Sequence, residues 1–353
     1  MSKSHKKPSG DQSKAPAPVK SSKPKKAAGP DNSLVADVLE TAMLQMKAED
    51  KILQLNGSAI EDKQMADNGF DPDQFNFAED GDLKQQEMAL PGLREKHKET
   101  NEYALHEDAK AFVKGEDDEH EVSPNDVGQG SLGDCYMMAG MIAVARANPD
   151  AIKELIKDNG DGTFDVTLYI RTGWSGSPKP ETITIDARLP EKYPGTPLYA
   201  KTGDKDEGGT ELWAALIEKA MAQKRGSYDL ISGGNIGKAE NMKFAGMAEI
   251  LTGEREGYMK TAGMAEDDAL LHIAIALEDK KSVTCDSQNM EDNPTMSKEA
   301  TKLNVYGNHA YAPESVDLDG RTISLTNPWR SNHVENLPVA SFLKWYRAIR
   351  IGA

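Results

Sequence analysis

The segment from Asp126 to Ala139, DVGQGSLGDCYMMA, constrains the fold most strongly, because a glycine-containing turn runs directly into an apolar stretch. The apolar stretch starts at Cys135 and predicts a buried helix that ends near Asn148 and Pro149. A thiol in the first turn of a helix faces unpaired backbone N–H groups and the positive end of the helix dipole, which lowers its pKa. Two interpretations are open from this segment alone: a packed core cysteine or a nucleophile.

Gln129 lies six residues before Cys135, across the turn. From there its side-chain amide can reach the group that a nucleophilic sulfur would attack. The choice between the two interpretations depends on whether the rest of the chain supplies a base.

The helices and strands that the sequence predicts after this segment indicate an α+β protein. Residues 163–170 and 182–186 alternate as strands do and can pair as a hairpin, after an Asx- and Gly-rich turn that does not fit an EF-hand loop. Residues 211–223 and 267–277 have the apolar spacing of helices, and residues 281–285 form a short strand in which Cys285 is a core thiol. Helices precede antiparallel strands, an order typical of α+β folds rather than doubly wound α/β folds.

A second hairpin near the C-terminus carries the other candidate site residues. Asp319 and Gly320 form its turn signal. A two-residue loop would set His309 opposite Arg330, three positions from Asn327, and a longer loop or a bulge would bring His309 and Asn327 within reach of each other. Thiol, imidazole and an orienting amide are the groups that a cysteine nucleophile requires.

The first hundred residues differ in composition from the rest. Residues 1–32 are rich in Lys, Ser, Pro, Ala and Gly and predict a disordered basic tail, with an electrostatic tether to an acidic partner or membrane surface as the alternative. Residues 33–55 predict an amphipathic helix that needs a partner. Residues 56–100 predict a linker or a loosely docked, pro-like segment.

Charge and cysteine content exclude several classes of protein. The net charge is −16, and because residues 1–30 carry about +7, the remaining residues are more acidic still, which argues against nucleic acid as the main ligand. Two cysteines provide no disulfide framework, so a working thiol points to a reducing compartment such as the cytoplasm. We expect no transmembrane segment and no Sec-type signal peptide, whereas export as an effector by another route stays open.

Three blocks of sequence, in this order, resemble the calpain family of papain-like cysteine proteases over roughly residues 122–350. The first block is QGSLGDC at residues 129–135. The second is LWAALIEKA at residues 212–220, continued by GSY at 226–228 and SGG at 232–234. The third is HAY at 309–311 followed by NPW at 327–329.

This resemblance implies a papain-like fold of two subdomains and a role for each matching residue. It implies a Cys-side subdomain at residues 101–245 and a His/Asn-side subdomain at residues 246–353. It implies that Cys135 is the nucleophile, His309 the base and then the acid, and Asn327 the group that orients His309. Three further roles are implied: Gln129 and the Cys135 N–H as the oxyanion hole, Trp329 as a shield of the His–Asn pair, and Gly233 and Gly234 as a lining of the substrate cleft.

Departures from the family pattern bear on substrate access and calcium. Tyr136 replaces the usual tryptophan, and Asn308 and Arg330 stand where glycine is common. The acidic calcium-loop insertion in the second subdomain of animal calpains is missing. Asp126 and Glu211 match calcium ligands of the first subdomain, so we expect one calcium site at most, the alternatives being ordinary surface acids and a site that needs no metal.

The leading hypothesis is therefore a calpain-like cysteine endopeptidase that acts on proteins or peptides and needs no cofactor for its chemistry. One alternative is a catalytically inactive calpain-like scaffold or peptide-binding module. Another is papain-like acyl transfer such as transglutamination, against which the calpain-like blocks and Asn327 argue.

Overall fold

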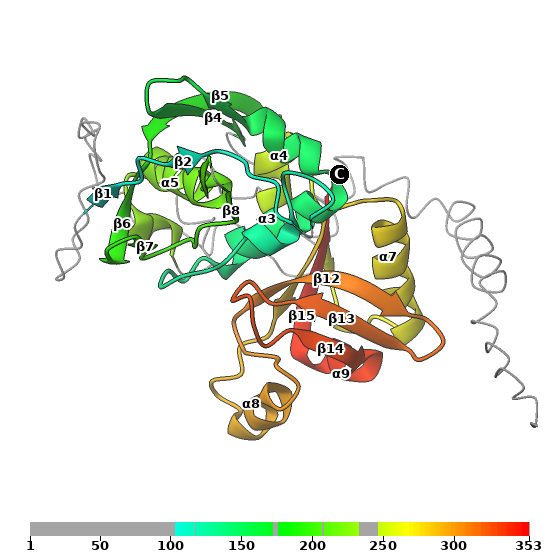
Figure 1. Cartoon of the computed structure of the whole chain (residues 1–353). Coiled ribbons are helices and arrows are strands. Elements are labelled where there is room, and N and C mark those ends of the chain that lie inside the picture. The colour runs from blue at the N-terminus through cyan, green and yellow to red at the C-terminus, as the bar shows by residue number, and fades with distance from the viewer. Residues whose placement is uncertain (1–102, 117, 172–175, 207, 233–245, 353) are drawn as a thin grey trace, which may run out of the picture.

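The computed structural model describes residues 103–352, except 117, 172–175, 207 and 233–245. The predicted basic tail, the amphipathic helix and linker that follow it, and Gly233 and Gly234 lie outside the described residues. The described chain forms two halves that lie one above the other in Figure 1, with helix α3 at their junction.

The first half combines helices with three small sheets. Its sheets have the strand orders β1-β6-β7, β2-β9-β8 and β3-β4-β5. Its helices, including short 3₁₀ turns, are η3 (Pro124–Asp126), α3 (Cys135–Ala147), α4 (Pro149–Leu155), α5 (Trp213–Arg225), η4 (Tyr228–Ile231) and α6 (Met247–Thr252). Its strands are β1 (Tyr103–Leu105), β2 (Ala109–Lys110), β3 (Ile156–Asp158), β4 (Thr163–Ile170), β5 (Lys179–Asp186), β6 (Arg188–Tyr193), β7 (Thr196–Pro197), β8 (Lys205–Asp206) and β9 (Gly209–Glu211).

The second half is one antiparallel sheet of six strands, in the order β10-β15-β11-β12-β13-β14. Helices α7 and α9 pack against it, and α8 extends away from it in Figure 1. The strands are β10 (Gly257–Lys260), β11 (Val283–Ser287), β12 (Ala310–Asp317), β13 (Thr322–Thr326), β14 (Val334–Pro338) and β15 (Tyr346–Ile351). The helices are α7 (Glu266–Glu278), α8 (Pro294–Thr301) and α9 (Val339–Trp345).

Most of the elements predicted from periodicity are present. The helix at Cys135 begins and ends as expected, β4 and β5 pair as the predicted antiparallel hairpin, and Cys285 is a fully buried core thiol on β11. The helix predicted from residue 211 instead begins at Trp213, because Glu211 belongs to β9, which pairs in parallel with β2.

Each half has its own hydrophobic core. The first core surrounds the buried face of α3 and extends along the chain to Leu251, and the second runs from Ala269 to Ile351. A small third cluster lies at the junction and joins Cys135 and Ala139 of α3 to Ala310 of β12. The two cores therefore meet where the candidate cysteine lies.

Within the described part of the chain, no helix is both long enough and apolar enough to cross a bilayer.

Candidate active site

Cys135 is the first residue of α3 and is 9% exposed. Its surroundings correct the expectation of a lowered thiol pKa. Burial raises the pKa of Cys135 to about 11, the backbone of Ala310 lowers it, and the charges of Asp134 and Asp286 raise it. Loss of water around a buried thiolate is the largest influence on this pKa.

His309 immediately precedes β12 and is held by the end of β11. The Ser287 hydroxyl accepts a hydrogen bond from the His309 N–H (2.9 Å) and donates to the Tyr306 carbonyl oxygen (2.6 Å), and the Ser287 N–H donates to the His309 carbonyl oxygen (2.9 Å). The imidazole is 7% exposed. His309 thus has a fixed backbone next to Ala310, which touches the Cys135 cluster.

The His309 ring is hydrogen-bonded to the side chain of Asn327, with 2.9 Å between Nε2 and Oδ1. The Trp329 N–H also donates to this oxygen (3.1 Å), and the Asn327 amide nitrogen donates to the Asn332 carbonyl (3.3 Å). These two bonds fix which atom of the amide faces the ring. His309 Nε2 therefore donates its proton, and Nδ1 of the neutral ring carries the lone pair.

The predicted approach of His309 to Asn327 is aided by a bulge and not by a longer loop. Asp317 pairs with Thr322, the register that a two-residue loop would also give, whereas Ala312 pairs with Thr326 because the register shifts by one residue between Pro313 and Ser315. This bulge moves His309 one position toward Asn327.

Aromatic rings surround the imidazole. The ring centroids of His309 and Trp329 are 4.5 Å apart, those of His309 and Tyr311 are 4.8 Å apart at right angles, and Tyr306 contacts the far side of Trp329. Burial lowers the pKa of His309, and the Asn327 hydrogen bond raises it. Burial thus shifts the pKa of each group toward its uncharged form, upward for the Cys135 thiol and downward for the His309 imidazole.

Gln129 lies in the turn before Cys135, and its side chain is bonded within that turn. Its Nε2 donates to the Leu132 carbonyl (2.7 Å), while its backbone N–H donates to the Pro328 carbonyl (2.8 Å). The Gln129 side chain also hydrogen-bonds the Asp134 carboxyl, which lowers the pKa of Asp134 against the larger effect of burial. Its role in an oxyanion hole stays a prediction.

Gly130 explains why the turn needs glycine. A Cβ atom there would lie 1.8 Å from the Tyr199 carbonyl oxygen, so any side chain would force the two loops apart. The neighbouring Ser131 N–H donates to the Leu198 carbonyl (2.9 Å), and the Lys201 N–H donates to the Gly128 carbonyl (2.7 Å).

Asp126 and Glu211 are buried close to each other. Burial, followed by the negative charge of Asp126, raises the pKa of Glu211 to about 9, and burial raises the pKa of Asp126 to about 6. Glu211 accepts hydrogen bonds from the backbone N–H groups of Val113 (2.9 Å) and Asp204 (3.3 Å). Asp126 accepts from the Ser123 N–H (2.6 Å) and from Trp213 Nε1 (3.0 Å).

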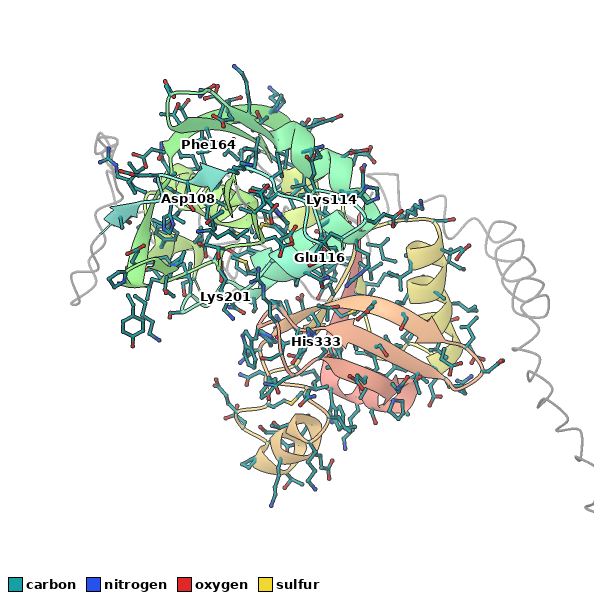
Figure 2. All side chains as sticks on the ribbon, viewed as in Figure 1. Asp108, Lys114, Glu116, Phe164, Lys201 and His333 are labelled. Carbon is teal, nitrogen blue, oxygen red and sulfur yellow. The ribbon has the colours of Figure 1, made fainter. Side chains whose placement is uncertain are left out.

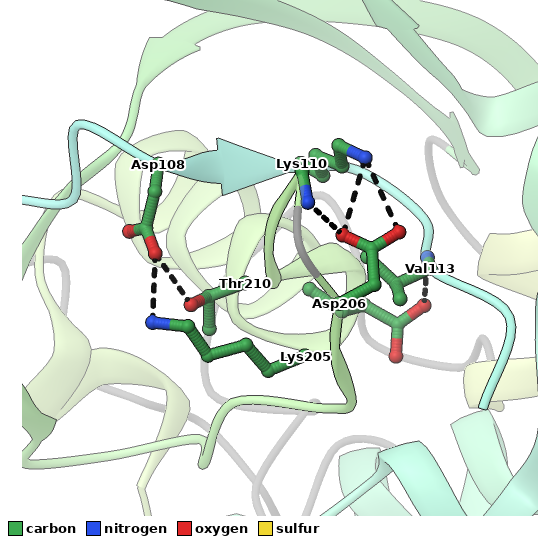
Figure 3. Close-up of polar contacts among 8 residues, drawn as sticks. Asp108, Lys110, Val113, Lys205, Asp206 and Thr210 are labelled. Atoms are coloured by element: carbon green, nitrogen blue, oxygen red, sulfur yellow. Dashed lines mark hydrogen bonds and ion pairs between the residues drawn. The ribbon is translucent and has the colours of Figure 1, made fainter. Parts of the chain in front are cut away.

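Contacts around β9 fix the position of this pair, and Figure 3 shows them. Asp108 accepts from Lys205 (3.0 Å) and Thr210 (2.9 Å), and Asp206 of β8 accepts from Lys110 (3.3 Å) of β2, on the other side of β9. The strand that carries Glu211 is thereby tied to both of its neighbours.

The described residues fit a calcium ion in ligand type. Asp118, Asp126 and Asp204 each offer a carboxylate oxygen within 4.8 Å of the others, and Asp126 Oδ1 is buried without a hydrogen-bond partner. Calcium prefers such oxygen ligands. Asp118 and Asp204 have no sequence signal that distinguishes them from other surface acids, and sequence reasoning missed them.

Asp134 and Glu218 form a second buried carboxyl pair, directly before the cysteine. Asp134 is fully buried, and burial raises its pKa to about 7, although hydrogen bonding with Glu218 lowers it. Glu218 accepts from the Ala200 N–H (3.0 Å). Asp134 lies inside the nucleophile block of the sequence, but only the structure shows that Glu218 is its partner.

Both residues that stand where glycine is common have a backbone conformation that glycine adopts easily. Asn308 and Arg330 have φ angles of 53° and 60°, in the left-handed region. Asparagine enters this region more readily than most residues, so Asn308 is a tolerated replacement, whereas arginine has no such preference.

The structure thus brings Cys135, His309, Asn327 and Trp329 to the junction of the halves, with Gln129 in the adjoining turn. Figure 2 labels Lys201 of the first half and His333 of the sheet, on the two sides of that junction. Lys201 Nζ donates to the Trp329 carbonyl (3.2 Å), and the Asn327 N–H donates to His333 Nδ1 (3.1 Å). Neither residue belongs to a motif, so sequence reasoning missed both.

Comparison with known proteins places this arrangement among proteases. A family model described as "Calpain family cysteine protease" matches residues 87–345. The chain is 26% identical over 231 residues to the calpain-type cysteine protease DEK1 of Arabidopsis thaliana, covering 61% of this chain and 9% of that protein. It is 28% identical over 211 residues to calpain-9 of Mus musculus, covering 58% of this chain and 28% of that protein.

A third relative, calpain-A of Drosophila melanogaster, is 26% identical over 251 residues, which cover 67% of this chain and 27% of that protein. The chain therefore spans well under a third of the length of these relatives. The similarity concerns only a part of each of these larger proteins.

Proposed function

The chain belongs to the calpain family of cysteine proteases, and from this premise we propose that it is a cysteine endopeptidase that uses Cys135, His309 and Asn327. Its substrates are proteins or peptides, and its chemistry is peptide-bond hydrolysis through an acyl-enzyme. The family and its protease class rest on the sequence match, whereas the residues and the activity are the proposal.

The hydrogen bond between His309 and Asn327 is the observation that carries this assignment. It turns the His309 ring so that Nε2 donates and Nδ1 is left as the proton acceptor. Trp329 covers the same ring and limits competition from water. A buried histidine with a fixed tautomer, next to the cluster that contains the only thiol at a helix start in the described chain, is arranged as a general base.

The reaction proceeds in two acyl transfers. His309 Nδ1 takes the Cys135 proton while sulfur bonds to the scissile carbonyl carbon, and the imidazolium then gives this proton to the leaving amine as the C–N bond breaks. A water molecule attacks the thioester with His309 again as base, and the thiol leaves with that proton. Proton transfer occurs within the reaction, which suits two groups whose pKa values are shifted toward their uncharged forms.

The remaining predicted roles concern the negative oxygen and the substrate. The Cys135 N–H and the side-chain amide of Gln129 would stabilise the oxyanion, where one donor contributes on the order of 10²–10³ in rate. Gly233 and Gly234 are proposed to contact the substrate main chain. Both lie outside the described residues, so this role rests on the sequence alone.

Calcium is not required for any of these steps. If an ion binds, Asp126 and Glu211, with Asp118 and Asp204, would hold it, and it would supply positive charge between the loops that meet there. The thiol chemistry points to a reducing compartment as the working location, whichever route brings the protein there.

A catalytically inactive peptide-binding module is the second candidate. It is favoured by the burial of Cys135 and the raised pKa of its thiol, because a protonated thiol is a poor nucleophile.

Labelling with a peptidyl epoxide decides between the two. We expect modification of Cys135 in the wild-type protein, loss of labelling and of casein cleavage in Cys135→Ala, and no effect of chelator on either result. Binding of a peptide without epoxide labelling or cleavage would instead identify the inactive module. Cys285, buried in the other core, serves as an internal control thiol.

A further inference from the structure

Arg330 occupies a backbone conformation that its residue type disfavours. Its φ is 60°, and a left-handed conformation costs an L-residue about 1–2 kcal/mol. Glycine would adopt it without strain. An arginine kept at such a position suggests that its side chain provides a compensating interaction, and the contacts of that side chain can be followed directly.

The Arg330 guanidinium donates hydrogen bonds to three backbone carbonyl groups on the other half of the molecule. Nε donates to Val127 (3.2 Å), and Nη2 donates to Asp126 and to Thr202 (2.9 Å). These carbonyls belong to two loops, one preceding Cys135 and one preceding β9. One planar cation therefore joins both loops to the segment that carries Asn327.

Gly128 leaves the space that this crossing requires. A Cβ atom on Gly128 would lie 2.6 Å from Arg330 Nε and 2.9 Å from Lys201 Cδ. The two cationic side chains pass over this glycine in opposite directions, since Lys201 donates to the Trp329 carbonyl.

The carboxylates nearby complement the charge of Arg330. Burial lowers the pKa of Arg330, and the negative charges of Asp126, Asp204 and Glu211 oppose this lowering. Among the described residues of the sheet half, Arg330 is the cationic side chain that donates to the carbonyls of residues 126–127. Arg330 therefore places a fixed positive charge next to the cluster of acids that fits calcium.

We propose that Arg330 is a positioning residue whose guanidinium acts as a built-in cation, joining the Asn327–Arg330 segment to the Cys135 half in place of a bound metal. This proposal rests on the proposed protease function. The bond from Gln129 N–H to the Pro328 carbonyl lies in the same contact, so the cation also aligns the turn before the cysteine with the segment that orients His309. The alignment of Cys135 with His309 thus needs no calcium.

The test measures the second-order rate of Cys135 labelling by a peptidyl epoxide in chelator, with mass spectrometry to identify the modified residue. Arg330→Gly removes the guanidinium and tolerates the φ angle, so it isolates the side-chain contacts. We expect a rate at least tenfold below wild type. Arg330→Lys, which keeps the charge but lacks the planar fork, should recover part of the loss. Millimolar guanidinium ion should raise the Arg330→Gly rate, because the residue borders solvent and the vacated place is accessible.

Arg321→Gly is the matched control. Arg321 also has a positive φ, 53°, but its guanidinium pairs with Glu266 and Asp267 inside the sheet half. It should label at the wild-type rate and show no response to guanidinium. Circular dichroism melting shows whether a variant is folded, which separates unfolding from misalignment. If Arg330→Gly does not fold, Arg330→Lys is the deciding variant: a reduced labelling rate of Cys135 supports the proposal, and an unchanged labelling rate overturns it.

Two further results would overturn the proposal. One is an Arg330→Gly protein whose Cys135 is labelled at the wild-type rate. The other is a tenfold or larger increase in the labelling rate of the wild-type protein when calcium is added, since a built-in cation would then be insufficient. If wild-type Cys135 is not labelled in either condition, the protease function itself fails, which is a distinct outcome. Titration calorimetry with calcium alone adds a readout independent of labelling: we expect weaker binding to wild type than to Arg330→Gly.

Discussion

Nε2 of His309 and Oδ1 of Asn327 are 2.9 Å apart, although the two residues lie on opposite arms of a hairpin whose register is shifted by a bulge. The same oxygen accepts the Trp329 N–H, so the amide is held by the chain immediately after it. The orientation of the imidazole is therefore determined by a segment of three residues, and changes in that segment should be visible in the chemistry.

Asn327→Ala should lower kcat/KM by roughly 5- to 150-fold, because a buried donor left without its acceptor costs about 1–3 kcal/mol. KM should change little, since Asn327 acts through His309. Hydrolysis of a fluorogenic peptide measures both. Asn332→Gly is the control, because it keeps the backbone carbonyl that accepts from Asn327 and tolerates the φ angle of 54° at this position. Equal losses in the two variants would contradict the orienting role.

The alkylation rate of Cys135 by iodoacetamide should keep rising with pH. The pKa of this thiol is raised to about 11, so the thiolate fraction increases about tenfold per pH unit below that value. A thiolate–imidazolium pair formed at rest would instead give a rate that is already level near neutral pH. Peptide mass mapping across pH 6–10 distinguishes Cys135 from Cys285, and a flat profile for Cys135 would show that the ion pair exists.

Asp134→Asn should make the stability of the protein less dependent on pH. The folded pKa of Asp134 is raised to about 7, so its contribution is present below the unfolded pKa near 4 and is lost as pH rises toward 7. Asparagine resembles the protonated carboxyl and does not titrate. Urea unfolding at pH 5 and pH 8 measures the effect, at about 1.4 kcal/mol per unit of pKa shift.

The comparison for Asp134→Asn is the difference between variant and wild type at each pH. The pKa of His309 is lowered, so His309 makes the free energy of unfolding rise with pH just below the ordinary pKa of histidine. This contribution is the same in the variant and the wild type and cancels in the difference. A wild-type protein that gains stability from pH 5 to pH 8 relative to the variant would contradict the assignment.

Gly130→Ala should reduce both melting temperature and activity. Its Cβ would lie 1.8 Å from the Tyr199 carbonyl oxygen and 2.6 Å from that of Leu198, so the turn before Cys135 must move. Gly195→Ala is the control: its φ is 76° with no atom within 4 Å of the new Cβ, so it should cost about 1–2 kcal/mol of stability and leave kcat/KM unchanged. A fully active Gly130→Ala would show that the loops separate without disturbing the thiol.

Local patterns in the sequence predicted much of the fold. The helix at Cys135, the β4–β5 hairpin and the β12–β13 hairpin follow from apolar periodicity and turn residues, which act over short distances. The predicted start of α5 was wrong because Glu211 pairs with the parallel strand β2, about a hundred residues earlier in the sequence. Periodicity contains no information about such a partner. The antiparallel sheet and its strand order likewise depend on distant contacts.

The same distinction between local patterns and distant contacts applies to the candidate site. Cys135, His309 and Asn327 could be proposed because each stands in a recognisable block. The thiol pKa could not be predicted, because the degree of burial depends on how the two halves meet. The partnership of Asp134 with Glu218, and the reach of Arg330 to Asp126 and Thr202, also depend on that packing. The roles of Gln129, Gly233 and Gly234, and the calcium ligands, stay predictions.

Strand β15 gives the sheet an unusual order of assembly. It lies between β10 and β11, although it follows both by many residues, and it pairs with each of them. A chain still emerging from the ribosome contains Cys135, His309 and Asn327 before it contains β15. The sheet that supports Ser287 and His309 is then open along its middle. If the chain is the protease proposed above, its activity should therefore arise only after synthesis has passed Ile351.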